Sequence, residues 1–561
     1  MKKTLKKNLG KKGQVLILSY FIISAFLIFS AGLLIKAMSE RNFAERQRLT
    51  AEAFYLAEGA TENAINTFST ALANFVISPT ISSYNVTTTY ATKNNFNVTT
   101  TLTRLETTDR LIVENNTNIY ACNYEATTTV THPENSAISV TVHQIIARRL
   151  IPTFQHAVFY NNDLEILPGA AMTLSGKIHS NNDIYLDSDG NTLTIDSSSL
   201  TSAGNIYNER KDSGLTKGTT LISVYGSSPV TYEAMNGLDS SSATWTTDAT
   251  SRWGGTVQSS VHGVTEQTTP SVGSIASNGY YATNANVVIT DNAIVKNGTL
   301  LVEGVDYPKD TVTATTSLYN NREGKYVRAS AVNLSKLSGA TGTCCSCTGT
   351  ACTSPASSCP CACKTPVSCP NNLPSNGLLY ATRTDASGAQ EPGIELTNGS
   401  TINSSVGLTV VSNDPVYIKG DYNTVSSKPT SIIADSLNLL SNNWSDTNST
   451  KALSSRTATQ TTFNCAFVAG IDTTTSGHYN GGLENYPRLH EGWSGINLNI
   501  VGSFVALWNS GIADGSWAYG APYYTAPKRN WQYNINFNNP ANLPPFTPMA
   551  VEIRRIAWWK D

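Results

Sequence analysis

The chain has 561 residues, and this length allows roughly two to four domains. Its formal net charge is -2 and only 14% of its residues are charged, against roughly 25% in ordinary soluble domains. Ser, Thr and Asn fill the difference, which is typical of an extracellular β-rich surface. Because the only marked lysine cluster lies at the N-terminus, the composition excludes an extended basic surface for nucleic acid.

A basic leader and an apolar segment open the chain. Six lysines precede Gly13 and Gln14, and the 21 residues from Val15 to Ile35 carry no charge. A membrane span needs about 20 mostly apolar residues to cross a hydrocarbon core of roughly 30 Å. The segment therefore predicts a single-pass membrane protein. The lysines would keep its N-terminus in the cytoplasm, and its body would be periplasmic or extracellular.

An amphipathic helical pattern continues directly from the apolar segment. From Lys36 to about Phe75 there is no proline, and the one glycine is Gly59. Apolar residues recur there at spacings of three and four: Leu49, Ala53, Leu56, Ala60 and Ala64. We therefore expect one transmembrane and amphipathic helix over residues 14–75, with its second half buried against a globular body.

This layout resembles that of type IV pilins and pseudopilins. The segment Arg48–Ala60, with its Ala-Phe-Tyr-Leu-Ala-Glu core, looks like the characteristic segment of the PilX N-terminal family, a minor-pilin branch. The resemblance implies that prepilin peptidase recognises a leader ending in Lys11 and Lys12 and cleaves between Gly13 and Gln14. It also implies that the mature helix leaves the inner membrane and packs against other pilin-like subunits in a filament.

Two positions depart from the pattern of major pilins. Counted from Gln14, the fifth mature residue is Leu18, where major pilins carry a glutamate that meets the N-terminal amine of a neighbour. Gln14 itself replaces the usual aromatic first residue. A chain without this glutamate is similar to tip-type minor pilins, which need no subunit above them. A signal-anchored surface protein that never enters a filament remains the alternative.

The rest of the sequence predicts an α+β fold, in which the long helix is followed by a large β-rich ectodomain. Short β-branched and aromatic runs separated by Asn, Asp and Gly indicate strands. We expect a leader (1–13), the spine helix (14–75), a small α+β head sheet (76–150), a β-rich region with a Ser/Thr/Gly insertion (151–334), a Cys-rich insertion (335–375), a second β-rich region (376–462) and an aromatic-rich C-terminal domain (463–561).

Two architectures fit the strands after Phe154. Runs such as Leu164–Ile166 and Val416–Ile418 follow one another closely, as in the stacked rungs of a β-solenoid. A twisted sandwich would show similar spacing. The segments Ser197–Thr283 and Ser335–Ser375 are poor in large aliphatic residues and are interpreted as insertions or long surface loops.

Eight of the ten cysteines fall between Cys344 and Cys369, which makes this segment the candidate disulfide region. They are Cys344, Cys345, Cys347, Cys352, Cys359, Cys361, Cys363 and Cys369. Outside the cytoplasm oxidation is expected, but eight cysteines allow 105 pairings. Two alternatives stay open: the Cys-x-Cys spacings could bind a soft metal, or the cysteines could be free thiols. Cys122 and Cys465 could pair with each other or be buried thiols.

Three segments carry chemically suggestive residues, and each has a structural interpretation that we favour. His179 in Gly176–Asp183 suits a solenoid corner. Asp187–Asn191 alternates oxygen ligands, so a structural calcium ion is a minor alternative to an Asp-Gly turn. We assign no other cofactor.

The segment Gly481–Trp493 could line a carbohydrate site, or even a glycan-cleaving one, through Glu484, Arg488, His490 and Glu491. We instead expect Arg488 to pair with a glutamate and Tyr486 and Trp493 to lie in a core.

The sequence thus predicts a non-enzymatic minor pilin-like protein of a type IV pilus or related secretion filament. Its β-rich body would act at the cell surface in assembly priming, adhesion or secretion, with a surface ligand that the sequence does not identify. The alternative function is a signal-anchored surface β-helix protein that binds polysaccharide.

Overall fold

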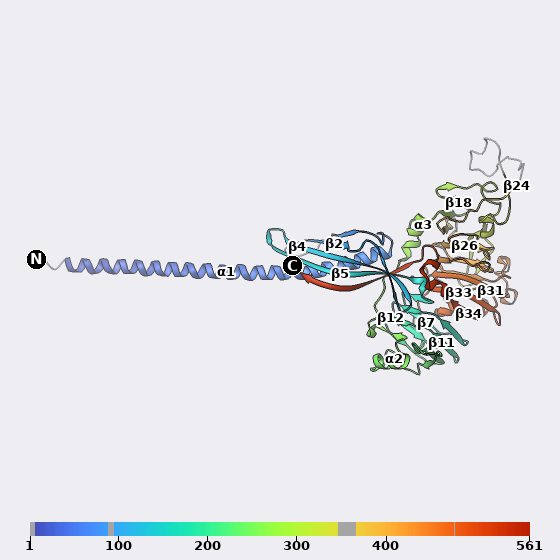
Figure 1. Cartoon of the computed structure of the whole chain (residues 1–561), viewed down its shortest axis with the longest axis horizontal. Coiled ribbons are helices and arrows are strands. Elements are labelled where there is room, and N and C mark those ends of the chain that lie inside the picture. The colour runs from blue at the N-terminus through green and yellow to red at the C-terminus, as the bar shows by residue number, and fades with distance from the viewer. Residues whose placement is uncertain (1–5, 88–94, 346–365, 476) are drawn as a thin grey trace, which may run out of the picture.

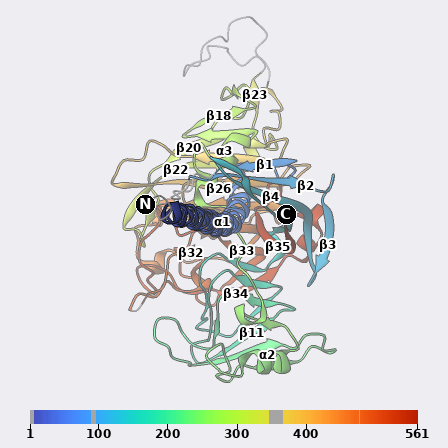
Figure 2. The ribbon, with the colours of Figure 1, turned by 90° about the vertical axis from the view of Figure 1, so that its left-hand side faces the viewer.

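The computed structural model describes residues 6–87, 95–345, 366–475 and 477–561. A long helix projects from a small antiparallel head sheet, and an elongated β-solenoid lies across the far end of the head (Figure 1). Viewed along the helix, the solenoid extends to both sides of it (Figure 2). The fold is therefore α+β, and the helix and the solenoid form the stem and the crossbar of a T.

Helix α1 (Lys6–Ala73) contains 68 residues, a length of about 100 Å at 1.5 Å per residue. Its second half packs on the head sheet through small side chains. The buried residues of this stripe are Leu49, Ala53, Ala57, Ala60, Ala64, Ile65, Phe68 and Leu72. The predicted stripe is confirmed at Leu49, Ala53, Ala60 and Ala64, whereas Leu56 is half-buried. The alanines allow the helix to approach the sheet closely, and Phe68 fills the space where it reaches Tyr124.

The head sheet is antiparallel and has the strand order β1-β2-β4-β5-β35, with β3 paired to β4. Its strands are β1 (Ser83–Val86), β2 (Asn97–Arg104), β3 (Arg110–Glu114), β4 (Thr117–His132), β5 (Asn135–Pro152) and β35 (Met549–Lys560). The last strand of the chain pairs with β5 from Met549 opposite Pro152 to Lys560 opposite Val142. The C-terminal strand β35 therefore forms one edge of the head sheet.

The solenoid begins with turns that pass through three sheets in succession. Its strands are β6 (Val158–Tyr160), β7 (Leu164–Ile166), β8 (Met172–Ser175), β9 (Ile178–Ser180), β10 (Ile184–Leu186), β11 (Thr192–Asp196), β12 (Leu200–Ser202), β13 (Ile206–Tyr207), β14 (Thr219–Ser223), β15 (Tyr232–Ala234) and β16 (Val257–Gln258). Every third strand stacks in parallel, so Val158, Ile178 and Leu200 share one position. Helix α2 (Trp245–Trp253) closes this end with Trp245 and Trp253 buried.

From β25 to β33 the second half of the solenoid alternates between two parallel sheets, and the last strand, β34, pairs with β33 in the same sheet. The strands of this half are β25 (Leu378–Thr382), β26 (Gln390–Thr397), β27 (Leu408–Val411), β28 (Val416–Lys419), β29 (Thr430–Ala434), β30 (Leu437–Leu440), β31 (Thr461–Ala469), β32 (Pro487–Leu489), β33 (Asn497–Ala506) and β34 (Lys528–Tyr533). The parallel pairing excludes the sandwich, because sandwich sheets are antiparallel.

The far end of this half carries shorter elements. They are α3 (Tyr280–Asn284), β17 (Val287–Thr290), β18 (Ala293–Lys296), β19 (Thr299–Leu300), β20 (Val312–Thr315), β21 (Tyr319–Asn320), β22 (Lys325–Asn333), α4 (Leu334–Leu337), β23 (Cys344–Cys345) and β24 (Pro366–Val367). Strand β22 is the longest of them and extends the second sheet by pairing in parallel with β26.

The chain enters the solenoid in the middle rather than at an end. The largest sheet has the order β16-β12-β9-β6-β33-β31-β29-β27-β25-β17. The chain runs outward from β6 to β16, crosses to the opposite end, and returns through β25 to β33. There Phe504–Ala506 pair in parallel with Val158–Tyr160. The first and last solenoid turns are therefore neighbours, and the whole solenoid is an insertion between head strands β5 and β35.

Two sequence interpretations differ from this arrangement. Residues 197–283, interpreted as an insertion or surface loop, contain β12 to β16, α2 and buried Ile206, Ile222 and Met235. One inward aliphatic residue per strand suffices in a narrow solenoid, so the Ser/Thr-rich composition was misleading. Residues 463–561, grouped by their aromatic content, are divided between solenoid strands β31 to β34 and head strand β35.

Candidate functional site

The first half of α1 is the main candidate functional surface. Within the helix Gly13–Ala73, the most apolar 18-residue window has a mean hydropathy of 2.3 and none of it is buried. In Figure 1 this part of the helix extends alone, away from head and solenoid. Large apolar side chains such as Phe21 and Phe29 are about two-thirds exposed. A surface of this kind needs a lipid or protein environment, so α1 is a candidate membrane span.

The predicted cleavage site lies within this helix. Gly13 and Gln14 are helical and exposed, and no heavy atom stands within 4 Å of an ideal Cβ on Gly13. The backbone of Lys11 and Lys12 continues the same helix. Leu18 is exposed, like the rest of the apolar segment. The five positions therefore lie on one continuous helix, and whether the leader is removed stays a prediction.

The cysteine segment is described at its two ends. Cys344 and Cys369 form a disulfide that ties β23 to the chain after β24, and Cys345 is also disulfide-bonded. The remaining candidates lie outside the described residues: Cys347, Cys352, Cys359, Cys361 and Cys363. Cys122 and Cys465 are buried free thiols in different parts of the fold, so they do not pair with each other.

The residues considered for carbohydrate chemistry are buried structural groups. Trp493 is fully buried and offers no platform for a sugar. One carboxylate oxygen of Glu484 accepts a hydrogen bond from the amide of Leu167 at 2.8 Å, and burial raises its pKa to about 7. Burial also lowers the pKa of His490 to about 3, and its Nε2 lies 2.9 Å from Asn438 Oδ1. These contacts give each group a role in holding solenoid turns together.

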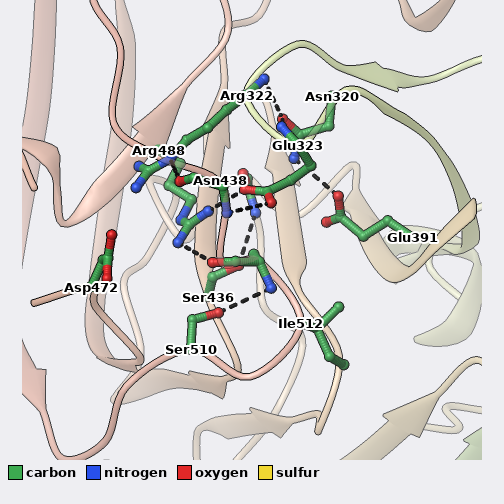
Figure 3. A network of polar contacts seen from close by, with 12 residues as sticks. Asn320, Arg322, Glu323, Glu391, Ser436, Asn438, Asp472, Arg488, Ser510 and Ile512 are labelled. Carbon is green, nitrogen blue, oxygen red and sulfur yellow. Dashed lines mark hydrogen bonds and ion pairs between the residues drawn. The ribbon is translucent and has the colours of Figure 1, made fainter.

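Arg488 has the glutamate partner that the sequence predicts. Its Nη1 lies 2.6 Å from Glu323 Oε1, and both side chains are at most 5% exposed. Figure 3 shows the surrounding network, in which Glu391 accepts a hydrogen bond from Asn320. Arg488 also donates to the carbonyl oxygen of Ala513. A buried ion pair with additional hydrogen bonds of this kind fixes the position of neighbouring segments.

The two other candidate segments also have structural partners. Asp187 accepts hydrogen bonds from the amides of Lys217 and Gly218, at 2.9 and 3.0 Å, which joins adjacent turns. His179 contacts Thr201 Oγ1 through Nδ1 at 2.9 Å and Asn181 Oδ1 through Nε2 at 3.1 Å. Burial lowers the pKa of His179 to about 4, so its imidazole is neutral near pH 7.

The structure also contains a polar cavity between the head and the solenoid that the sequence did not predict. Its volume is about 190 Å³, and its lining comes from β3, β4, β5 and β35 on one side and from the solenoid turns around β9 and β12 on the other. The signal available in the sequence was Lys177, a charged residue two positions before His179 in an otherwise uncharged run. Its partners are 60 residues earlier, beyond the range of local patterns.

No family model matches the chain, and no curated protein matches it. Among solved structures, the chain is similar to the competence-associated pilin ComZ from Thermus thermophilus, with 8% sequence identity, coverage of 91% of this chain and 98% of that chain, and a TM-score of 0.24. A TM-score this low carries no argument about fold or function, and the resemblance to the PilX family stays a prediction.

Proposed function

We propose that the protein is a minor pilin-like structural component of a type IV pilus or related secretion filament. One observation carries the proposal: a single helix has an entirely exposed apolar half, while its other half is the buried spine of a small antiparallel sheet. An exposed apolar helix is suited first to the bilayer and then to contact with the helices of other subunits. The rigid spine transmits the position of the docked half to the head.

The leader and Leu18 determine how the chain is processed and where it lies in the filament. Prepilin peptidase cleaves between Gly13 and Gln14 after the inner membrane has taken up the helix with Lys11 and Lys12 on the cytoplasmic side. With leucine at position 18, the subunit has no carboxylate for the amine of a subunit above it, which suits the filament tip. The solenoid then faces outward and serves assembly priming, adhesion or secretion.

The N-terminal peptide of the chain tests cleavage. In cells that contain the peptidase, mass spectrometry should find a mature chain that begins at Gln14, and deletion of the peptidase should restore the leader. Gly13→Leu should block cleavage. Gly10→Leu, a substitution of the other leader glycine, is the matched control and should be processed like the unmodified chain.

Purified filaments provide the second test. Peptides of the solenoid should be present in sheared filaments from the unmodified strain and missing from those of the Gly13→Leu strain. If the unmodified chain keeps its leader and is always missing from filaments, the proposal is wrong. If that chain also binds polysaccharide, the evidence favours the anchored surface protein instead.

A further inference from the structure

The cavity between head and solenoid has a floor made by one ladder of side chains. Phe159, His179, Thr201 and Gln258 occupy the same position on the successive strands β6, β9, β12 and β16. The last three of them line the cavity, and the head strands form its other wall. The site is therefore built jointly by the head sheet and the solenoid.

A buried cation without a counter-ion lies in this cavity. Lys177 is 5% exposed, and its ammonium group donates to Asn116 O at 2.7 Å and to Thr117 Oγ1 at 2.8 Å. Both acceptors are neutral, and within the described parts of the chain no carboxylate forms an ion pair with Lys177. Burial lowers the pKa of this lysine to about 8. Buried charges are normally paired, so the third N–H of Lys177 is available to an anion.

The carboxylates that line the cavity are already occupied. Glu114 lies 2.6 Å from Arg149, and Glu552 lies 2.7 Å from the same guanidinium. Arg554 contacts both glutamates, at 3.2 and 2.8 Å. Three cationic side chains thus face two carboxylates, which leaves the cavity with one uncompensated positive charge.

The wall also contains an acceptor that lacks a donor. The side-chain oxygen of Gln267 is buried and has no hydrogen-bond partner among the described residues, although the backbone of this residue is held by Asn181. A ligand hydroxyl would satisfy it, just as a ligand carboxylate would satisfy Lys177. The cavity volume is below the roughly 300–1,000 Å³ of pockets for drug-sized ligands, so the ligand has to be small.

We propose that this cavity binds a small hydroxycarboxylate, with its carboxylate on Lys177 and a hydroxyl on Gln267. Two sources share this chemistry: a free hydroxy acid and a sugar acid. The site is independent of filament assembly, because every group that forms it belongs to one folded chain.

Calorimetric titration of the full chain in a polyoxyethylene detergent tests the proposal without adding sugar head groups. Lactate represents the free hydroxy acid, glucuronate the sugar acid, and glucose the uncharged sugar. We expect saturable binding of lactate or glucuronate and none of glucose. Binding of lactate alone identifies a free acid as the source, whereas binding of glucuronate alone identifies a sugar acid.

Substitutions then assign the binding to the cavity. Lys177→Met should weaken binding about 10- to 100-fold, as expected for loss of a hydrogen bond to a charged group. The matched control Lys217→Met removes an exposed lysine and should leave the affinity unchanged. Because Lys177 also joins head to solenoid, Gln258→Glu provides a second variant that adds a negative charge at a half-buried position and should weaken binding without removing that link.

Three results overturn the proposal. They are equal binding of glucuronate and glucose, equal affinities for the Lys177→Met and Lys217→Met variants, and no binding of either acid to the correctly folded chain. Each is distinguishable from a failure of the proposed filament function, because the titration needs neither cleavage of the leader nor assembly.

Discussion

The hydroxyl of Ser503 donates a hydrogen bond of 2.6 Å to the carbonyl oxygen of His156, although 347 positions separate the two residues. Beside this contact, Phe504 in β33 pairs with Val158 in β6. The contact lies on the seam where the returning half of the solenoid meets the outgoing half. Closing the seam requires strands of the returning half to be in register, so it is among the most non-local contacts of the fold.

Gly502 tests how tightly the strands beside this seam are packed. A Cβ added there would lie 1.8 Å from the carbonyl oxygen of Cys465 on the neighbouring strand, where the backbone cannot move aside. We expect Gly502→Ala to lower the stability of the solenoid by about 1–3 kcal/mol or more. Thermal unfolding followed by circular dichroism measures the change. Gly388→Ala, where no atom lies within 4 Å, is the control, and equal melting temperatures for the two variants would contradict this packing.

The ion pair between Arg488 and Glu323 should be costly to break. Arg488→Met leaves the Glu323 carboxylate buried without its cation, for which we expect a loss of about 3–5 kcal/mol. Arg328→Met breaks the more exposed pair with Asp385 and should cost at most about 1 kcal/mol. Denaturant unfolding of both variants gives the comparison. A loss at Arg488 no larger than that at Arg328 would show that water reaches the buried site.

Glu395 should make the stability depend on pH. Burial raises its pKa from 4.5 to about 7, so between these values the folded chain holds a proton that the unfolded chain releases. Stability therefore falls as the pH rises through this window. Glu395→Gln should make the fall shallower by up to about 1.4 kcal/mol per pH unit, whereas exposed Glu134→Gln should leave it unchanged. The free energy of unfolding, measured from pH 5 to 8, tests this prediction. If it depends on pH with the same slope in both variants, Glu395 does not have this role.

The two buried thiols should resist modification in the folded chain. Cys122 and Cys465 are at most 1% exposed, and burial raises the pKa of Cys465 strongly, which keeps it in the unreactive thiol form. Alkylation at pH 8 followed by peptide mapping should leave both residues unmodified in the native chain and modify both in denaturant. Rapid native labelling of either cysteine would mean that its surroundings open readily.

Local patterns predicted those parts of the fold whose contacts are local. The buried face of α1 follows from apolar residues three and four positions apart, and Leu164–Ile166 follows from a short run between turn residues. No such signal links Met549–Lys560 to β5, because the two strands are about 400 positions apart. The same applies to the site: Arg488 could be assigned a glutamate partner by chemistry, but Glu323 is 165 positions away, and no pattern in the sequence marks it.

The insertion of the solenoid between β5 and β35 determines how a mechanical load would pass through the molecule. Tension on the crossbar enters the head at Pro152 and Met549, which are paired neighbours, and is directed along the strands. Because both strands are pulled in the same direction, the load passes to the ladder between β5 and β4. Its hydrogen bonds lie perpendicular to the strands, so traction shears many of them together instead of peeling them one by one. The head therefore holds the solenoid by two adjacent strands and transmits the load to α1, which packs on the same sheet.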